Sequence, residues 1–390
     1  MDKKIANLIA YCQGIYKKEN GIALYEKYLK EINTVTPQEV FLVMNEQLKM
    51  GVPVQEILVF LDKIIKTFQT SMETYVWTRP KQNSFLYYLR QENEALLEIL
   101  QTFKRVIKSQ NMALIKKTLP AFLDKVNRYN DHYLKLENIL FPYMEKKKPQ
   151  FEGLKIMWAL HDGIRQDLKE TTLLLEDENV SEKLINVKLG NLYFKLYGVV
   201  QKQELILFPT ATEIFNDDEF NQMHRQSFDF EFANIGRPKI PHFSFKDLKK
   251  KRKINSEFMF KTETGSLNFE QLELMLGAIP VDMTYVDEND KVTFFSRPKE
   301  RLFTRSAAII GRDVRNCHPP STVHVVEKII ASFKDGTKDH ETFWIQIKDK
   351  FVLIQYFAMR NKEDAYKGTL EVSQEISEIK SLEGEKRLLD

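Results

Sequence analysis

The hexapeptide ENILFP, residues 137–142, recurs as ELILFP at residues 204–209, which is 67 positions further along the chain. Both copies begin with glutamate, carry Ile-Leu-Phe at the third to fifth positions and end with proline, so that Ile139 matches Ile206. Because proline lacks the amide donor that a further helical turn needs, we expect it to close a helix in the same way in both copies. The repeat therefore predicts a pseudo-symmetric pair of helical hairpins.

Four long helical stretches surround this repeat. Each has about twenty residues with apolar side chains at positions i, i+3, i+4 and i+7, and none shows strand-like alternation. They cover residues 89–107, 122–140, 157–175 and 189–207. Four such helices with short connections favour an antiparallel four-helix bundle, which we assign to residues 76–225.

A smaller helical domain precedes the bundle at residues 1–75. Its clearest local signal is TPQE at residues 36–39, in which threonine is the N-cap, proline takes the first helical position and glutamate closes a capping box. Nothing in this region requires chemistry. We expect an all-α N-terminal half, in which this small domain is followed by the bundle.

From residue 266 to residue 380 the hydrophobic period changes from helical to strand-like. The predicted strands, in chain order, are residues 281–287, 291–296, 341–347, 351–359 and 368–372. Short helical segments separate the second strand from the third, and residues 381–390 form a terminal helix or tail. This order predicts an α+β domain of about 110 residues at the end of a multidomain chain.

Composition and charge narrow the classes of function. The 390 residues are 43% hydrophobic and 29% charged, and a net charge of only +3 argues against a nucleic-acid partner. Cys12 and Cys317 form neither a disulfide framework nor a metal pair, so we expect a cytoplasmic protein. No apolar run approaches the roughly 20 residues that cross a bilayer, so we expect no membrane association. Residues 226–265, with five consecutive cations at 249–253, are interpreted as a solvated linker rather than a phosphate-binding patch.

Parts of the chain resemble known families. The stretches IPVDMTYVDENDKVTFFS (279–296), IGRDVRNCHPPSTVHVVEKIIASFKDG (310–336) and GTLEVSQEISEIK (368–380) resemble the opening hairpin, central helices and last strand of a PAS domain. The bundle resembles the haemerythrin-like (HHE cation-binding) family, whose members hold non-haem iron with inward histidine and glutamate side chains. A helical N-terminal domain of an uncharacterised type, then the bundle, then PAS, resembles an uncharacterised bacterial family of multidomain proteins.

The haemerythrin-like pattern is incomplete in this chain. It places His-x-x-x-Glu shortly before Leu-Phe-Pro, where positions i and i+4 share one face of the helix. The first repeat has His132, but Leu136 stands at i+4, and the second repeat has Val199 and Gln203 at the corresponding positions. On the first helix, where the family usually supplies histidine, residues 79–82 read Arg-Pro-Lys-Gln.

The resemblance still implies a set of candidate metal ligands. They are His132, His161 on the third helix, and the repeat glutamates Glu137 and Glu204. Each glutamate lies one position beyond the family's i+4 site, which rotates it by roughly 100° on an ideal helix. Two alternatives stay open: a degenerate iron site, with a single ion held weakly by the two histidines, or a bundle that kept its fold and lost its metal.

For the PAS domain, the resemblance implies a ligand pocket that in some members holds haem through a histidine. We expect His318, Trp344 and Tyr356 to contribute to such a pocket. His324 is the more tempting haem ligand, but helical phase places it opposite the apolar face of its helix. An apolar pocket is also what any PAS core contains, so haem is the weaker of the two cofactor predictions, after non-haem iron.

These features together favour a sensor over a metabolic enzyme. We expect a regulatory protein that responds to a metal, a cofactor, a diatomic gas or a redox signal and acts on a separate signalling partner. The alternatives are a non-haem-iron protein acting on oxygen, nitric oxide or peroxide, and a metal-free adaptor. No nucleophile–base pair, phosphate loop or zinc motif is present in the sequence. Apolar stripes at residues 269–276 and 376–382 flank the PAS sheet and predict a homodimer through this domain.

Overall fold

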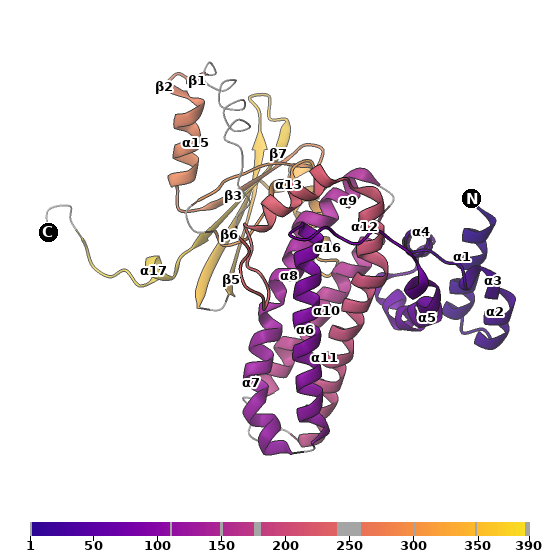
Figure 1. The fold of residues 1–390 in the computed structure, drawn as a ribbon. Helices are drawn as coiled ribbons and strands as arrows, with labels where there is room; N and C mark the ends of the chain where they lie inside the picture. Colours follow the sequence, from indigo (N-terminus) through magenta and orange to yellow (C-terminus); the bar gives the residue numbers. More distant parts are fainter. Residues whose placement is uncertain are drawn as a thin grey trace. The chain divides into compact units, whose positions relative to one another are not determined.

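The structure, a computed structural model, describes residues 2–109, 111–148, 151–174, 181–239, 259–298, 301–347 and 349–386. The chain (Figure 1) divides into two compact units, one of Met1–Lys239 with Pro319–Ser321 and one of the remaining residues. Among the described residues the first unit is helical and the second contains helices and strands, which confirms the predicted fold class. The cation run at 249–253 lies outside the described residues, and the predicted boundary at residue 75 stays a prediction.

The first unit begins with five helices. They are α1 (Lys3–Tyr16), α2 (Gly21–Lys27), α3 (Leu29–Ile32), α4 (Pro37–Lys49) and α5 (Val54–Thr74). The predicted capping box starts α4: Thr36 Oγ1 accepts the Glu39 amide at 3.3 Å, and Glu39 Oε2 accepts the Thr36 amide at 2.8 Å. Two of the amide groups at this helix end are thereby satisfied.

The predicted four-helix bundle is confirmed (Figure 1). Its first and third helices are continuous, and its second and fourth each contain a π-helical turn, written η1 or η2. The elements are α6 (Phe85–Lys108), α7 (Met112–Arg128), α8 (Asn130–Lys135), η1 (Leu136–Leu140), α9 (Phe141–Lys147), α10 (Leu154–Leu174), α11 (Glu182–Lys202), η2 (Gln203–Leu207) and α12 (Phe208–Ile214). A further helix, α13 (Asp217–Ser227), follows the bundle.

The two prolines of the repeat do not close their helices, so that expectation is wrong. Pro142 and Pro209 stand in the first turns of α9 and α12, which continue the helices beyond them. Directly before each proline the chain makes a π-helical turn, in which the Phe141 amide bonds to the Leu136 carbonyl five residues back. Such a turn shifts the bonding pattern by one residue, and a proline without an amide hydrogen is accommodated there.

The repeat is also longer than the hexapeptide, because Lys135 and Lys202 precede its two copies at matching positions. Both lysines are buried. Helices α9 and α12, which continue the two copies, contact one another at the same end of the bundle (Figure 1). Glu137 and Glu204 therefore occupy equivalent places near one end, as the sequence predicts.

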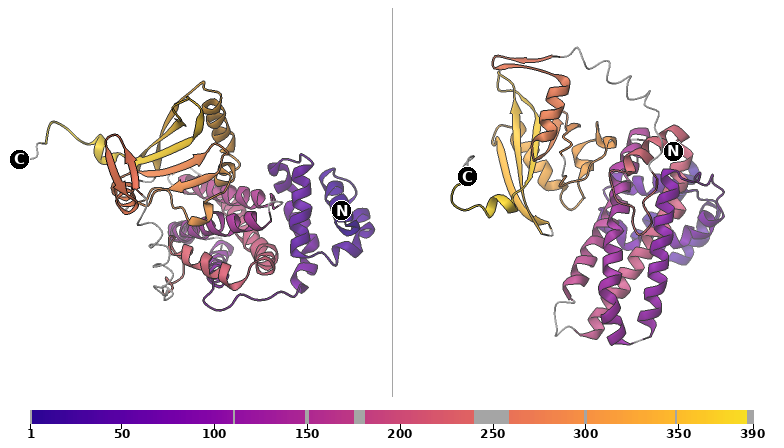
Figure 2. Two further views of the ribbon diagram at one scale, coloured as in Figure 1. Left: turned by 90° about the horizontal axis from the view of Figure 1, so that it is seen from above. Right: turned by 60° about the vertical axis from the view of Figure 1, so that its left-hand side comes forward.

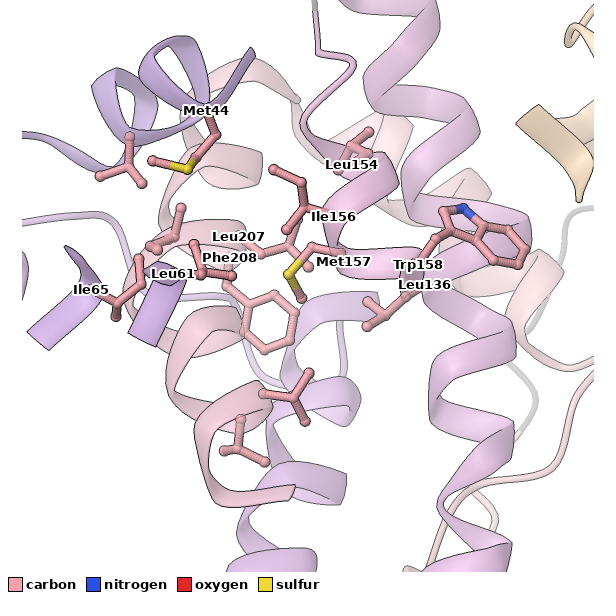
Figure 3. Packing of buried hydrophobic residues seen from close by; sticks show 14 of the residues in the cluster. Met44, Leu61, Ile65, Leu136, Leu154, Ile156, Met157, Trp158, Leu207 and Phe208 are labelled. Atoms are coloured by element: carbon pink, nitrogen blue, oxygen red, sulfur yellow. The ribbon is translucent and has the colours of Figure 1, made fainter. Parts of the chain in front are cut away.

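The N-terminal helices pack against the fourth helix at its π turn. Figure 3 shows Met44 of α4 and Leu61 of α5 close to Met157 and Leu207 of the bundle, and all four belong to one apolar core. At the edge of this contact, Lys202 Nζ donates to Asp62 Oδ1 of α5 at 2.6 Å. The π turn and its lysine thus help to fix the position of the N-terminal helices on the bundle.

The second unit contains an antiparallel five-stranded sheet in the order β4-β3-β7-β6-β5 (Figure 2). Its elements are the hairpin β1 (Met259–Thr262) and β2 (Gly265–Asn268), α15 (Phe269–Ala278), β3 (Asp282–Asp287), β4 (Val292–Phe295), η3 (Ala307–Ile309), η4 (Val314–Cys317), α16 (Val323–Lys334), β5 (His340–Ile347), β6 (Lys350–Arg360), β7 (Tyr366–Glu375) and α17 (Ser377–Lys380). All five predicted strands are confirmed, whereas β1 and the first residue of β2 fall where a linker was predicted. None of the helices in the described segments has the length and apolar character needed to span a bilayer.

Phe208, which is fully buried, should contribute strongly to the stability of the bundle. We expect Phe208→Ala to lower the free energy of unfolding by about 3–5 kcal/mol, because it removes apolar contact and leaves a cavity. The matched control is Phe194→Ala on α11, where the ring is 73% exposed and the change should stay within about 0.5 kcal/mol. Urea unfolding followed by circular dichroism measures both values, and equal losses would contradict the core assignment.

Candidate functional site

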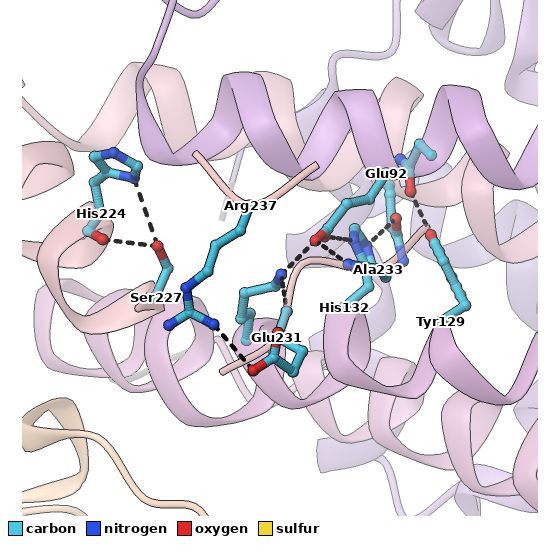
Figure 4. A network of polar contacts seen from close by, with 11 residues as sticks. Glu92, Tyr129, His132, His224, Ser227, Glu231, Ala233 and Arg237 are labelled. Carbon is cyan, nitrogen blue, oxygen red and sulfur yellow. Dashed lines mark hydrogen bonds and ion pairs between the residues drawn. The ribbon is translucent and has the colours of Figure 1, made fainter. Parts of the chain in front are cut away.

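Five polar side chains meet in the core of the bundle beside the π turns. Glu92 comes from α6, His132 from α8, Glu137 from η1, His161 from α10 and Gln203 from η2, and each is at most 1% exposed. Figure 4 shows the part of this group around Glu92 and His132. Charged and polar groups are costly to bury without hydrogen-bond or ion-pair partners. The partners of these five side chains therefore determine which chemistry the core can support.

Glu92 is the most heavily bonded carboxylate of this core. His132 Nδ1 donates to Glu92 Oε2 at 2.8 Å, and His132 Nε2 lies 2.9 Å from Gln203 Oε1. The Lys135 ammonium bonds to Glu92 Oε1, and the amide of Ala233 donates to the same oxygen at 2.7 Å. Burial lowers the pKa of Lys135, and the Glu92 carboxylate opposes that shift. Lys135 is therefore a buried cation held by a buried anion.

Glu137 forms a second paired group. His161 Nδ1 donates to Glu137 Oε1 at 2.8 Å, and Arg165 Nη2 donates to Glu137 Oε2 at 2.8 Å. Burial raises the pKa of Glu137, but Arg165 and His161 outweigh burial and hold this pKa below its usual value. Burial lowers the pKa of His161 to about 4, with Glu137 opposing the shift. His161 Nε2 has no hydrogen-bond partner in the structure, while the Tyr133 ring stacks on the imidazole with centroids 4.1 Å apart.

Glu204, the repeat counterpart of Glu137, is half-buried and is paired in a similar manner. Its Oε1 accepts from Asn93 Nδ2 at 3.1 Å, and its Oε2 accepts from Arg90 Nε at 2.8 Å. The Tyr129 hydroxyl donates to Asn93 Oδ1, which orients the amide toward the glutamate. The second and fourth helices thus each present one glutamate to a neighbouring helix that supplies an arginine.

A di-iron centre does not fit this arrangement. Each glutamate has a side-chain cation as partner, and all six carboxylate oxygens accept bonds from protein donors. Di-iron sites in helical bundles need several carboxylates whose oxygens face the metal. Within the part of the chain that the structure describes, no three His, Cys, Asp or Glu side chains form a group that could hold a metal ion. Iron would have to displace the cations that already neutralise the core.

The structure brings the four predicted ligands, His132, His161, Glu137 and Glu204, into or beside this core. That they bind a metal stays a prediction. The expected rotation of the glutamates on an ideal α-helix is wrong, because both lie within π-helical turns that change the register. Residues 79–82 precede α6 and are not part of the first helix, so they were the wrong place to seek its histidine.

Asn93 of α6 contacts Glu204 from the first helix, as His161 contacts Glu137 from the third. Neither Asn93 nor its neighbour Glu92 was predicted. A signal for Glu92 was present: it lies three residues after Leu89, on the apolar stripe of its helix, where a carboxylate needs a buried partner.

The cations Lys135 and Arg165 were also missed. Lys135 and Lys202 stand at the same position before the two copies of the repeat. A surface position would not require the same residue in both copies, so this match could have indicated lysines that face inward. Arg165 follows His161 by four residues, which places both on one face of α10 toward Glu137. Both signals depend on knowing which helices are neighbours, and the sequence alone did not specify that.

The second unit contains a cavity of about 30 Å³ between α16 and the sheet. Five of its nine lining residues are apolar, and the polar or charged members are His318, Tyr356, Thr369 and Glu371. Arg305 Nη2 donates to Glu371 Oε1 at 3.2 Å, which balances that carboxylate. Burial lowers the pKa of His318, with Glu371 opposing it, and burial raises the pKa of Tyr356. Two of the three predicted cofactor residues are thus together, whereas Trp344 on β5 is 64% exposed and does not line this cavity.

Haem does not fit this cavity. A volume of about 30 Å³ holds one or two water-sized molecules, while pockets for drug-sized ligands measure roughly 300–1,000 Å³. His324 is exposed on α16, as its helical phase predicts, and offers no axial ligand from this face. The cavity as it stands in this structure is thus too small for haem, while His318 lines it, and haem in the PAS domain stays a prediction.

Acid should destabilise the bundle through His161. Its pKa in the folded protein is about 4 against an ordinary value of 6.5, so the unfolded chain binds the proton first as the pH falls. We expect the free energy of unfolding to fall by at most about 3 kcal/mol between pH 6.5 and pH 4, with Glu137 adding a further loss at lower pH. Urea unfolding across this range tests it, and His161→Gln should flatten the slope. A variant with the same slope as the parent would contradict the assignment.

Comparisons with known proteins agree with this geometry. Residues 84–211 match the model described as Hemerythrin HHE cation binding domain, and residues 272–377 match the model described as PAS domain. No curated protein matches the chain.

Three solved structures are similar to parts of the chain. The crystal structure of a C-terminal domain from Streptococcus mutans is 28% identical and covers 33% of this chain and 99% of its own, with a TM-score of 0.32. The PAS domain of a protein from Colwellia psychrerythraea is 16% identical and covers 28% and 97%, with a TM-score of 0.23. A sensory box sensor histidine kinase from Vibrio cholerae is 8% identical and covers 34% and 96%, with a TM-score of 0.21. By its family matches, this chain consists of a helical N-terminal region, a hemerythrin HHE domain at residues 84–211 and a C-terminal PAS domain at residues 272–377.

Proposed function

We propose that this chain is a sensory protein whose PAS cavity is the input site and whose bundle works without a di-iron centre. The observation that carries the proposal is the cavity at His318 and Tyr356, whose lining combines these two side chains, Thr369 and Glu371 with apolar residues of α16 and the sheet. A PAS domain joined to a hemerythrin HHE domain supports a signalling role. The ligand is a molecule of a few non-hydrogen atoms, because the cavity has no room for a larger one.

The bundle supports a regulatory role better than an enzymatic one. Catalysis on oxygen, nitric oxide or peroxide by non-haem iron needs carboxylate oxygens open toward the metal, and here each of those oxygens already accepts a bond from the protein. Neutralising pairs of this kind stabilise one arrangement of the helices instead. We therefore propose that the protein is not an enzyme and that its output depends on contacts with a partner.

The input site can be tested with a variant that fills the cavity. Val326 of α16 lines the cavity, and Val326→Leu adds about the volume of one methylene there. The matched control is Val325→Leu, at the neighbouring position that does not line it. We expect native mass spectrometry of the full chain, purified from cells, to show a small bound mass in the parent and the control but not in Val326→Leu. Absence of any bound mass, or the same mass in all three, would contradict the proposal.

A homodimer through the PAS domain is the second part of the proposal. No residue of α15 is buried, and Phe269, Leu274 and Met275 are exposed apolar side chains on this helix, with Leu274 67% exposed. Ile379 and Leu382, which follow the sheet, are exposed as well. Burying large apolar side chains of this kind stabilises an interface by roughly 1.5–3 kcal/mol each. A two-fold contact between copies would cover both stripes.

Light scattering on the full chain tests the dimer. We expect two copies at tens of micromolar, and we expect Leu274→Glu to shift the protein toward the monomer because a charge would be buried in the contact. Phe194→Glu, at an exposed position on the bundle, is the control and should leave the dimer intact. A monomeric parent protein, or equal effects of both substitutions, would contradict this part of the proposal.

A further inference from the structure

We propose that residues 228–234, here called the strap, form a latch that is held by the polar core of the bundle through Glu92 and Lys135. Release of the strap would be the way in which the core acts on the chain that leads into the C-terminal unit. The purpose of the latch rests on the proposed sensory function, while its existence rests only on the contacts of the bundle. The strap follows α13 directly and is joined to the second unit by the chain beyond Lys239.

Two backbone groups of the strap bond to the buried ion pair. The amide of Ala233 donates to Glu92 Oε1 at 2.7 Å, and the Glu231 carbonyl accepts from Lys135 Nζ at 2.8 Å (Figure 4). Ala233 is buried, so its amide could not bond to water in place of the carboxylate. The strap therefore contacts both the anion and the cation of the pair, one with a donor and one with an acceptor.

Aromatic contacts hold the strap over the ammonium. The Phe232 ring lies 4.3 Å from Lys135 Nζ, within the range of a cation–π interaction. The same ring contacts Tyr88 of α6 at 5.9 Å and Phe228 at 5.4 Å between centroids. Asn234 ends the strap with a bond from its Nδ2 to the Lys125 carbonyl at 2.9 Å. These contacts exclude water from the ion pair and strengthen its bonds.

The ion pair and the strap depend on one another. If the strap lifts, Lys135 loses its carbonyl and its ring, and Glu92 loses one of its donors. If Glu92 or Lys135 loses its charge, the hydrogen bonds that fasten the strap and the contact of the ammonium with the Phe232 ring weaken. A change of charge in the core is therefore felt at the strap.

The repeat provides an internal comparison. Lys202 stands at the position equivalent to Lys135, but its Nζ bonds to Asp62 of α5 and to the Gly198 carbonyl. The two lysines thus have the same place in the repeat and fasten different neighbours, the strap in one case and the N-terminal helices in the other. Substituting Lys202 removes the same charge at a matched depth and leaves the strap contacts intact.

Hydrogen exchange of the full chain tests the latch. We expect Lys135→Met, which keeps the length of the side chain and removes its charge, to speed exchange of the amides at 231–235 roughly ten-fold or more. Chymotrypsin should cleave after Phe232, which is buried in the parent protein, faster in the same variant. Lys202→Met should leave both measurements at the strap unchanged and speed exchange in α5. Unchanged protection of the strap in a folded Lys135→Met protein, or equal effects of both substitutions, would overturn the proposal.

If the Lys135→Met protein does not fold, a second variant tests the latch. Phe232→Ala leaves Glu92 and Lys135 in place and removes only the ring that covers the ammonium. The latch predicts faster exchange at 231–235 with normal helix content by circular dichroism, and full protection would overturn it. Ligand binding at the PAS cavity, followed by native mass spectrometry in the same variants, shows separately whether the proposed input site is intact.

Discussion

Neutralisation of buried carboxylates by protein cations is the constraint on which the bundle depends. An unpaired carboxylate in such a core is strongly unfavourable, and removing one partner of a buried pair costs about 3–5 kcal/mol. Each pair joins two different helices, so the pairs also set the relative positions of those helices. The pairs are Glu92 with Lys135, Glu137 with Arg165, and Glu204 with Arg90. In this bundle, which matches a cation-binding family, protein side chains neutralise these three carboxylates.

The π turns place this chemistry in the fold. Each turn lies between a buried lysine and a proline, and each shifts the helix register so that the repeat glutamate reaches the neighbouring helix. Because the two copies of the repeat have different neighbours, their equivalent lysines bond to different segments of the chain. Lys135 fastens the strap, and Lys202 fastens the N-terminal helices. The two copies of the repeat thus attach two different segments to the bundle.

Much of the fold follows from periodicity, and much of the site does not. The four bundle helices, the capping box before α4 and the five strands were all predicted, because each depends on local spacing. The π turns were not predicted, since they differ from an α-helix by one residue in bonding and leave the apolar stripe nearly unchanged. Glu92, Lys135 and Arg165 were missed because their roles arise from contacts between helices. The size of the PAS cavity, about 30 Å³, is set by packing that no single residue reveals.

The central claim is that protein cations neutralise the buried glutamates in place of metal ions. Measuring the metal content of the protein and the effect of a chelator on its unfolding tests this claim most directly. The full chain would be expressed with added iron, purified without oxygen and analysed for metal, and its thermal unfolding would be followed with and without a chelator. If the glutamates are neutralised by Lys135, Arg165 and Arg90, the protein will contain far less than one metal ion per chain and its unfolding temperature will not change. Two irons per chain, or a clear fall in the unfolding temperature on chelation, would contradict the account.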